Sequence, residues 1–248
     1  EMLLNDLLWL KPKLEPIAVD SAEIKLQVYN KQQLSQDIPR LKSIYTLLIS
    51  AHYRTRPSDL RQLMEDENQC VIVAESGDRI AGVLLLNREG GFEAHLSVEV
   101  FFGRRRPQGH LFAQMLTAQA GIRHFAEYRG YRIQRITVNP GCRRLGIGAR
   151  LIKRGLQMVK DERLDYLGCS FALDITLAPF WRKLDFELVH ISSGQGKSTG
   201  RQTVALVKTV NPELGGDVTL LKQKLTQYLP TWLLTYCRRM YWQDVFAL

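Results

Sequence analysis

The sequence has little of what membrane-anchored and secreted proteins use. No run of apolar residues comes near the roughly 20 that a transmembrane helix needs, so we expect no transmembrane helix. The four cysteines lie far apart without a C-x-x-C pair, and the five histidines show no ligand spacing. This pattern predicts reduced thiols of a cytoplasmic protein, with neither a disulfide framework nor a metal site. No signal-peptide pattern is visible and the first residue is Glu1, so we expect a piece of a longer protein.

The composition is that of an ordinary globular protein with an excess of positive charge. Hydrophobic residues make up 45% and charged residues 24% of the 248 positions, which excludes disordered and fibrous classes. The 34 Lys and Arg residues outnumber the 25 Asp and Glu residues, and the net charge is +9. A polyanionic partner is therefore expected, and by charge alone nucleic acid, an acidic membrane surface and a phosphate-rich cofactor all fit. The motifs below lead us to expect RNA and a phosphate-rich cofactor, and no membrane partner.

The periodicity of apolar residues predicts an α/β (α+β) fold with a mixed sheet flanked by helices. Period-two alternation or short apolar runs predict strands at 23–29, 70–74, 80–86, 132–138, 165–171, 186–192 and 202–209. Helical spacing predicts helices at 31–50, 58–66, 92–120 with an interruption at 103–107, 146–161 and 177–184. We expect a leading segment at 1–20, one domain at 21–212, and a helical tail at 213–248. Two helices, separated at Pro230, are expected in that tail.

The turn between the predicted strand at 132–138 and the following helix has the chemistry of an anion site. The segment that follows Val138 runs Asn-Pro-Gly-Cys-Arg-Arg-Leu-Gly-Ile-Gly-Ala, so the helix opens on two glycines preceded by two arginines. A helix start leaves backbone N–H groups unpaired and carries partial positive charge, and glycine lets a phosphate oxygen approach them closely. A tight strand-to-helix turn, with glycines needed only for packing, is the alternative.

A second phosphate-loop pattern is incomplete. Gly196-Lys197-Ser198 resembles the end of a P-loop, but Ile191 stands where its first glycine belongs. The residues after it alternate like a strand and do not begin a helix. We therefore interpret 193–201 as a hairpin loop.

The R-x-x-G-x-G turn resembles the pyrophosphate loop of the GCN5-related N-acetyltransferases. Longer stretches resemble one branch of that superfamily, the bacterial tRNA(Met) cytidine acetyltransferases. The matching stretches lie in order at 51–61, 105–114, 135–140, 144–148, 164–171 and 180–189. The resemblance implies transfer of acetyl from acetyl-CoA to N4 of the wobble cytidine of elongator tRNA(Met), by direct attack in a ternary complex. Members normally carry an ATP-driven helicase-like module upstream, and ATP would act only through that module.

The resemblance also implies where acetyl-CoA would lie. Its contacts would be Ile136, Thr137, Val138, Arg143, Arg144, Leu145, Gly146, Ile147, Gly148, Ala149, Thr176 and Lys183. Two of these positions depart from the family pattern, because Thr176 stands where a Glu is usual and Lys183 where an Arg is usual. Lys183 keeps the positive charge of an arginine but lacks the planar guanidinium that forms two parallel hydrogen bonds. Thr176 cannot supply the negative charge of a carboxylate.

The acetyl transfer needs a positioned amine, a group that accepts a proton from this amine, and a hydrogen-bond donor to the developing oxyanion. His110, which follows the basic loop and heads a predicted helix, is our candidate for proton acceptor or substrate contact, or else a capping residue. Glu99 and Asp174 are alternatives. The backbone N–H of Val138 is the candidate oxyanion donor.

Two arginine clusters predict an RNA surface. The predicted contacts are His52, Arg54, Arg56, Arg104, Arg105 and Arg106. Two other functions stay open: an acetyltransferase for a protein or small-molecule amine, and an RNA-binding module without catalysis.

Overall fold

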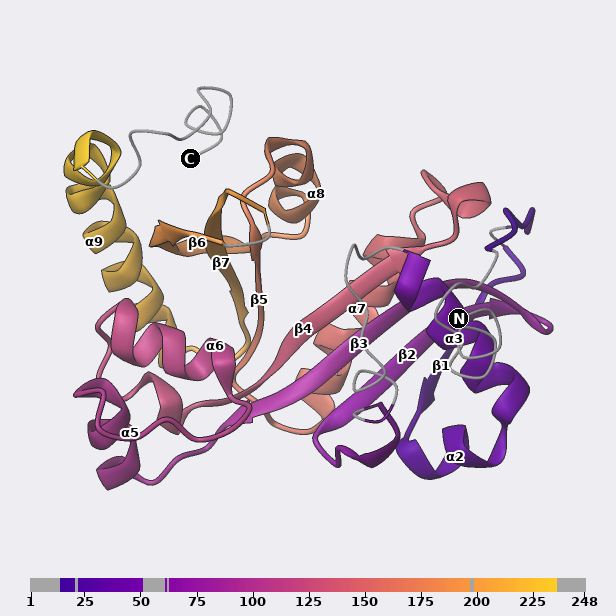
Figure 1. Ribbon diagram of the computed structural model, residues 1–248, viewed down its shortest axis with the longest axis horizontal. Helices are drawn as coiled ribbons and strands as arrows, with labels where there is room; N and C mark the ends of the chain where they lie inside the picture. Colours follow the sequence, from indigo (N-terminus) through magenta and orange to yellow (C-terminus); the bar gives the residue numbers. More distant parts are fainter. Residues whose placement is uncertain (1–13, 21, 51–60, 62, 197–198, 236–248) are drawn as a thin grey trace, which may run out of the picture. The chain divides into compact units, whose positions relative to one another are not determined.

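A computed structural model describes residues 14–20, 22–50, 61, 63–196 and 199–235. The chain forms two compact units, one made of residues 1–87 and 133–157 and the other of residues 88–132 and 158–248. Figure 1 labels their helices and strands. Each unit is described by itself below.

Within the described residues, seven strands follow one another in the hydrogen-bonded order β1-β2-β3-β4-β5-β7-β6. Their bounds are β1 Lys25–Tyr29, β2 Gln69–Ser76, β3 Arg79–Gly90, β4 Arg129–Val138, β5 Tyr166–Ala172, β6 Glu187–Gln195 and β7 Gln202–Thr209. The pairs β1–β2, β2–β3, β5–β7 and β6–β7 are antiparallel. Each strand predicted from alternation is present, which confirms the mixed sheet; β4 begins three residues before its predicted start.

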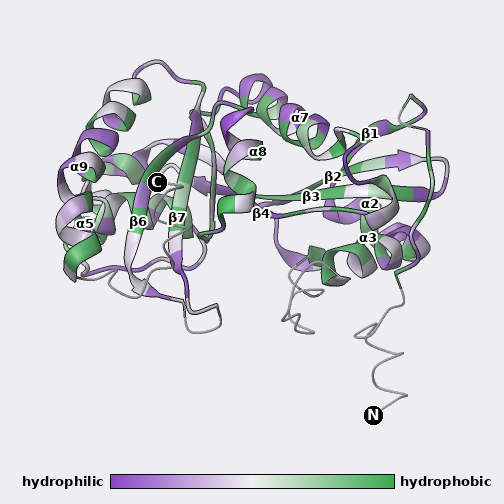
Figure 2. Ribbon diagram, turned by 90° about the horizontal axis from the view of Figure 1, so that it is seen from above, coloured by the Kyte–Doolittle hydropathy of each residue, from purple (hydrophilic) through white to green (hydrophobic). Residues whose placement is uncertain are grey.

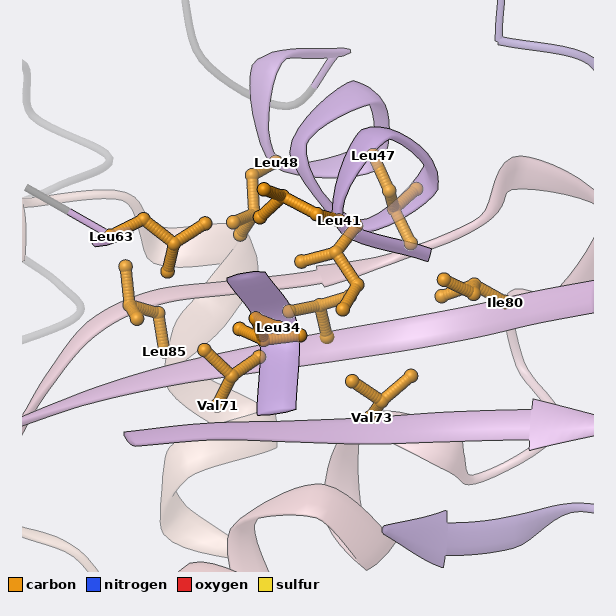
Figure 3. Close-up of a cluster of buried hydrophobic side chains, with 11 residues drawn as sticks. Leu34, Leu41, Leu47, Leu48, Leu63, Val71, Val73, Ile80 and Leu85 are labelled. Atoms are coloured by element: carbon orange, nitrogen blue, oxygen red, sulfur yellow. The ribbon is translucent and has the colours of Figure 1, made fainter. Parts of the chain in front are cut away.

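The first unit packs helices α2 (Lys31–Gln36) and α3 (Ile38–Ser50) on strands β2 and β3. Figure 3 shows leucines of both helices pointing toward Val71, Val73, Ile80 and Leu85 of the strands. The predicted helix at 31–50 is wrong in one respect, because it is broken at Asp37. The Asp37 carboxylate accepts the Arg40 amide at 3.0 Å and so caps α3, whose second residue is Pro39.

The second unit contains α5 (Ala94–Phe101), α6 (Leu111–Gln114), a π-helical turn (Met115–Gln119) and a 3₁₀ turn (Phe125–Glu127). These elements supply Phe112, Leu116 and Phe125 to a core that also holds Tyr166 of β5. The predicted interruption of the helix at 92–120 is confirmed. A further 3₁₀ turn (Ile175–Leu177) leads into α8 (Ala178–Arg182).

The last helix of the second unit differs from the prediction for the tail. Helix α9 runs from Leu214 to Thr235 and passes through Pro230 without ending there. Proline removes one backbone donor from a helix, and a helix held by other contacts tolerates that loss. Here the first turns of α9 are held by Leu214, Val218 and Leu221, which are buried in the core of the unit. The predicted break at Pro230 is therefore wrong.

Strands β6 and β7 form the hairpin predicted in place of a phosphate loop. Gln195 pairs with Gln202, and the Gly196 amide donates to the Arg201 carbonyl at 2.8 Å. Strand β7 begins at Gln202, where a phosphate loop would continue into a helix with free N-terminal amides.

Helix α7 (Ile147–Asp161) is amphipathic, and Figure 2 shows hydrophilic and hydrophobic colours alternating along it. Its buried residues include Ile147, Leu151, Ile152 and Val159, at the spacing of one helix face. Within the described part of the chain, no helix combines the length and the apolar character needed to cross a membrane.

Candidate functional site

In the first unit, the end of β4 is anchored by the side chain of Asn139. The Asn139 amide donates to the Ala81 carbonyl at 2.9 Å, which continues the pairing with β3. Its buried side chain accepts from the amides of Ile17 and Gly141, both at 3.1 Å, and donates to the Glu15 carbonyl at 3.1 Å. Three backbone groups are thus satisfied by one side chain, and the chain leaves the strand in a defined direction.

The next turn is tightly packed against the segment before β1. A 3₁₀ turn covers Pro140–Cys142, and a Cβ atom on Gly141 would lie 2.3 Å from the Ile17 carbonyl oxygen. The Cys142 thiol donates to the same carbonyl at 3.3 Å. Burial raises the pKa of this thiol, which suits a structural cysteine and not a nucleophile.

The loop that follows, residues 143–146, is exposed. Arg144 has a φ of +66° and Gly146 a φ of +75°, so the backbone turns twice through the left-handed region. A Cβ atom on Gly146 would meet nothing within 4 Å, so its glycine is required by conformation, and its surroundings are open.

Helix α7 begins directly after this loop. The first hydrogen bond of its i to i−4 pattern runs from the Arg150 amide to the Gly146 carbonyl at 3.1 Å. The amides of residues 147–149 therefore have no acceptor in that pattern. No acidic residue lies in its first turn. An open loop, two exposed arginines and unpaired helical amides form an arrangement that can hold a diphosphate.

The structure brings the predicted residues of the first unit into one strand–turn–helix segment. Ile136, Thr137 and Val138 end β4, and 143–149 form the exposed loop and the start of α7. Thr137 and Ile147 are buried, so a ligand would meet their backbone and not their side chains. The sequence pattern located the segment but did not show which residues would contact a ligand through the backbone and which through the side chain.

Thr176 and Lys183 lie in the second unit, on the 3₁₀ turn before α8 and at the end of α8, and both are exposed. The Thr176 amide and hydroxyl both donate to Oδ1 of Asp174, at 2.9 and 2.7 Å. These bonds hold the pKa of the Asp174 carboxyl below its usual value. A carboxylate therefore stands two residues before the position where the family pattern expects one.

His110 joins the end of β3 to the start of α6. It has a φ of +47°, and its Nδ1 accepts the Gly90 amide at 2.9 Å. An acceptor at Nδ1 leaves the proton of the neutral ring on Nε2. His110 therefore presents a donor at Nε2, and proton acceptance at Nδ1 requires this bond to break.

The buried carboxylate of Glu89 has no counterpart among the predicted residues. Its Oε2 accepts the amides of Phe112 and Ala113 at 2.7 and 3.3 Å, and its Oε1 pairs with Arg132. It thus satisfies the start of α6 from a neighbouring strand. Its partners are 23, 24 and 43 residues away, so no local sequence pattern reveals them.

The predicted RNA residues Arg104, Arg105 and Arg106 are exposed on the loop between α5 and α6. Glu99, an alternative proton acceptor, forms an ion pair with Arg104 at 3.1 Å. His52, Arg54 and Arg56 lie outside the described residues. Across the described ranges, no three His, Cys, Asp or Glu residues cluster as metal ligands.

Comparison with solved structures shows the fold. The apo form of a mutant agmatine N-acetyltransferase matches with a TM-score of 0.53 at 14% identity, covering 76% of this chain and 100% of that chain. At this identity the likeness concerns the fold alone.

Comparison with curated proteins and family models shows the family. The tRNA(Met) cytidine acetyltransferase TmcA of Photorhabdus asymbiotica subsp. asymbiotica is 33% identical over 84% of this chain and 32% of its own length. TmcA of Pectobacterium atrosepticum is 43% identical over 65% of this chain and 23% of its own length. The chain thus spans a third or less of the length of these relatives. The family model described as GNAT acetyltransferase 2 matches residues 43–159 and 152–211. These two segments take in the strand–turn–helix segment, the α5–α6 loop and strands β5 to β7, and the chain belongs to the GNAT acetyltransferase 2 family.

Proposed function

We propose that this chain transfers acetyl from acetyl-CoA to N4 of the wobble cytidine of elongator tRNA(Met), forming N4-acetylcytidine. The observation that carries the proposal is the match to relatives named tRNA(Met) cytidine acetyltransferase over 65–84% of this chain. Under this proposal the acetyltransferase domain occupies 21–212, the tail at 213–248 takes part in tRNA binding, and the protein works in the cytoplasm.

The diphosphate of acetyl-CoA is assigned to the turn at 143–149. The exposed loop with open space at Gly146, the arginines at 143 and 144 and the amides at the start of α7 fit such a group. The backbone of Ile136, Thr137 and Val138 is assigned to the arm that follows the diphosphate. Thr176 and Lys183 are assigned further contacts, with Lys183 supplying charge.

The chemical step places the cytidine amine against the thioester carbonyl that acetyl-CoA supplies when bound. The lone pair of N4 is delocalised into the ring, so positioning and removal of a proton are essential. We assign the Val138 N–H to the oxyanion. We assign His110 to the substrate contact, through its Nε2 donor, because the Gly90 amide occupies the Nδ1 lone pair.

Calorimetric titration with acetyl-CoA tests the cofactor part of the proposal. Gly146→Val forces a branched residue into a φ of +75° and is expected to weaken acetyl-CoA binding at least tenfold. Gly194→Val is the matched control, because Gly194 also has open surroundings but lacks a positive φ. Equal weakening by both variants would contradict the assignment.

Mass analysis of nucleosides tests the reaction itself. tRNA incubated with this chain and acetyl-CoA, with and without ATP, is expected to yield N4-acetylcytidine. Binding of acetyl-CoA without any acetylated cytidine would favour a protein or small-molecule amine as acceptor. Binding of tRNA without binding of acetyl-CoA would favour an RNA-binding module without catalysis. That alternative is motivated by Thr176, which stands where the family pattern has a Glu.

A further inference from the structure

The loop at 102–110 between α5 and α6 is held in place at its first end by the helix that precedes it. The amides of Arg104 and Arg105 both donate to the Glu99 carbonyl, at 2.9 and 3.3 Å, and the Gly103 amide donates to the Val100 carbonyl at 3.0 Å. Gly103 has a φ of +72°, which lets the chain fold back over the last turn of α5. The basic loop therefore begins in a fixed position.

The second end of the loop is held by one side chain. Nε2 of Gln114 lies 2.9 Å from the Pro107 carbonyl, 2.8 Å from that of Gly109 and 3.2 Å from that of His110. Gln114 belongs to α6, and His110 is itself bonded to Gly90 of β3. The arginines thus project from a segment whose backbone is ordered at both ends, and ordering before binding lowers the entropic cost of binding.

An aromatic ring stands exposed at the start of the same loop. Phe102 is 58% exposed although it is a large apolar side chain, and Phe101 supports its ring edge-on at a centroid distance of 5.2 Å. The Arg104 guanidinium lies over the Phe102 ring, 5.1 Å from its centroid. Leu111, at the far end of the loop, is 54% exposed. Exposed rings of this kind, bordered by arginine, suit the stacking of an unpaired base.

The charged groups around the ring leave two arginines unneutralised. A hollow of about 360 Å³ is lined by His95, Leu96, Glu99, Arg105, Arg106 and Pro107. Glu99 pairs with Arg104 at 3.1 Å, and Glu93 pairs with His95 at 3.3 Å. Among residues that the structure describes, neither Arg105 nor Arg106 has an ion-pair partner. The hollow therefore offers a site for an anionic group beside the exposed ring.

We propose that Phe102, Arg104, Arg105 and Arg106 form a cradle for one unpaired nucleotide of RNA, with its base on Phe102 and its phosphate at Arg105 and Arg106. This inference rests on the proposed tRNA substrate and names the residues that receive it. An acidic peptide would satisfy the arginines but leave the aromatic ring without a role. A single-stranded nucleotide supplies both a flat ring and a phosphate, which matches both features of the surface.

Fluorescence anisotropy with a labelled cytidine heptamer tests the cradle on the full chain. Phe102→Ala is expected to weaken binding about tenfold or more, because stacking of one base on an aromatic ring contributes about 1–3 kcal/mol. An abasic heptamer, which keeps the phosphates, is expected to bind wild type and Phe102→Ala equally. The Phe102→Trp variant is expected to bind normally and to lose fluorescence when the heptamer is added.

The arginines are tested by the salt dependence of the same binding. Arg105→Gln and Arg106→Gln are each expected to reduce the slope of log affinity against log salt by about 0.7, the value for one phosphate contact of a single strand. Arg182→Gln, which removes an exposed arginine from α8, is the matched control and should leave the slope unchanged.

Three outcomes would overturn the cradle. The first is that wild type and Phe102→Ala bind the heptamer equally well. The others are that the wild-type chain binds a blunt RNA duplex, or a hexaglutamate peptide, as tightly as it binds the heptamer. None of them bears on acetyl-CoA binding or on N4-acetylcytidine formation by the wild-type chain. Failure of the cradle is therefore distinguishable from failure of the proposed function.

Discussion

His190 makes the stability of the second unit depend on pH. It lies in β6 with only 5% of its surface exposed, and its ring packs edge-on to Trp232 of α9 at a centroid distance of 6.1 Å. Its buried Nε2 has no hydrogen-bond partner among the described residues. Burial lowers the pKa of His190 from 6.5 to about 4, because the charged ring would lose its hydration.

The sign of the effect follows from where the protons are bound. Between pH 6.5 and 4 the unfolded chain takes up a proton at residue 190 and the folded chain does not, so acid favours unfolding. With pKa values of 6.5 and about 4, the loss of unfolding free energy between pH 7 and pH 5 is about 2 kcal/mol. The stability contribution is complete above pH 6.5 and is lost as the pH falls toward 4.

The assay is urea unfolding of wild type and His190→Phe at pH 7 and pH 5. Phenylalanine keeps a planar ring against Trp232 and cannot be protonated, so the variant should lose about 2 kcal/mol less than wild type between the two pH values. His95→Gln is the matched control, since it removes a histidine whose side chain is exposed. Equal losses in wild type and His190→Phe would refute the reasoning.

Three further predictions concern single side chains whose contacts are defined. Asn139→Ala removes three bonds to backbone groups at a buried position and is expected to cost about 3 kcal/mol in urea unfolding; an unchanged midpoint would contradict this. Thr176→Val removes the hydroxyl that donates to Asp174 and is expected to raise the pKa of the Asp174 carboxyl, as measured by carbon-detected NMR titration. An unchanged pKa would show that the Thr176 hydroxyl does not lower it. Tyr128 donates to Asp217, and burial with this carboxylate raises the pKa of Tyr128 to about 12. The folded chain therefore keeps a proton that the unfolded chain releases above pH 10, so stability falls from pH 10 to 12, and Tyr128→Phe should lack that part of the loss.

Much of the fold was predictable because its signals are local. The alternation in 23–29 reflects strand β1, whose residues 25–28 alternate between exposed and half-buried, and the apolar spacing of 146–161 reflects a helix with one buried face. Strand β7 differs, because Val204 to Val207 are all buried and both of its faces are covered. The loop at 103–107 was predictable from glycine and proline beside a run of charge. Each of these features depends on neighbours within a few residues.

Two elements were misplaced, one because of distant partners and one because of a local cap. Pro230 ends a helix in isolation, yet α9 passes through it because its first turns share a buried core with residues about 90 or more positions earlier, such as Phe112 and Phe125. The break between α2 and α3 has a local cause, because the Asp37 side chain caps α3 through the Arg40 amide three residues later, and apolar spacing alone does not reveal that cap.

By itself, the sequence determined the mixed sheet and the strand–turn–helix segment, because hydrophobic periodicity and turn residues are local features of a sequence. The left-handed φ of Gly146 came from the structure. Only the tertiary structure decided that His110 presents its Nε2 donor, that Glu89 caps α6, and that Gln114 holds the arginine loop. These roles arise from hydrogen bonds whose directions are set when separate elements pack. The type of a residue states which bonds it can make, and the packed chain decides which of them it does make.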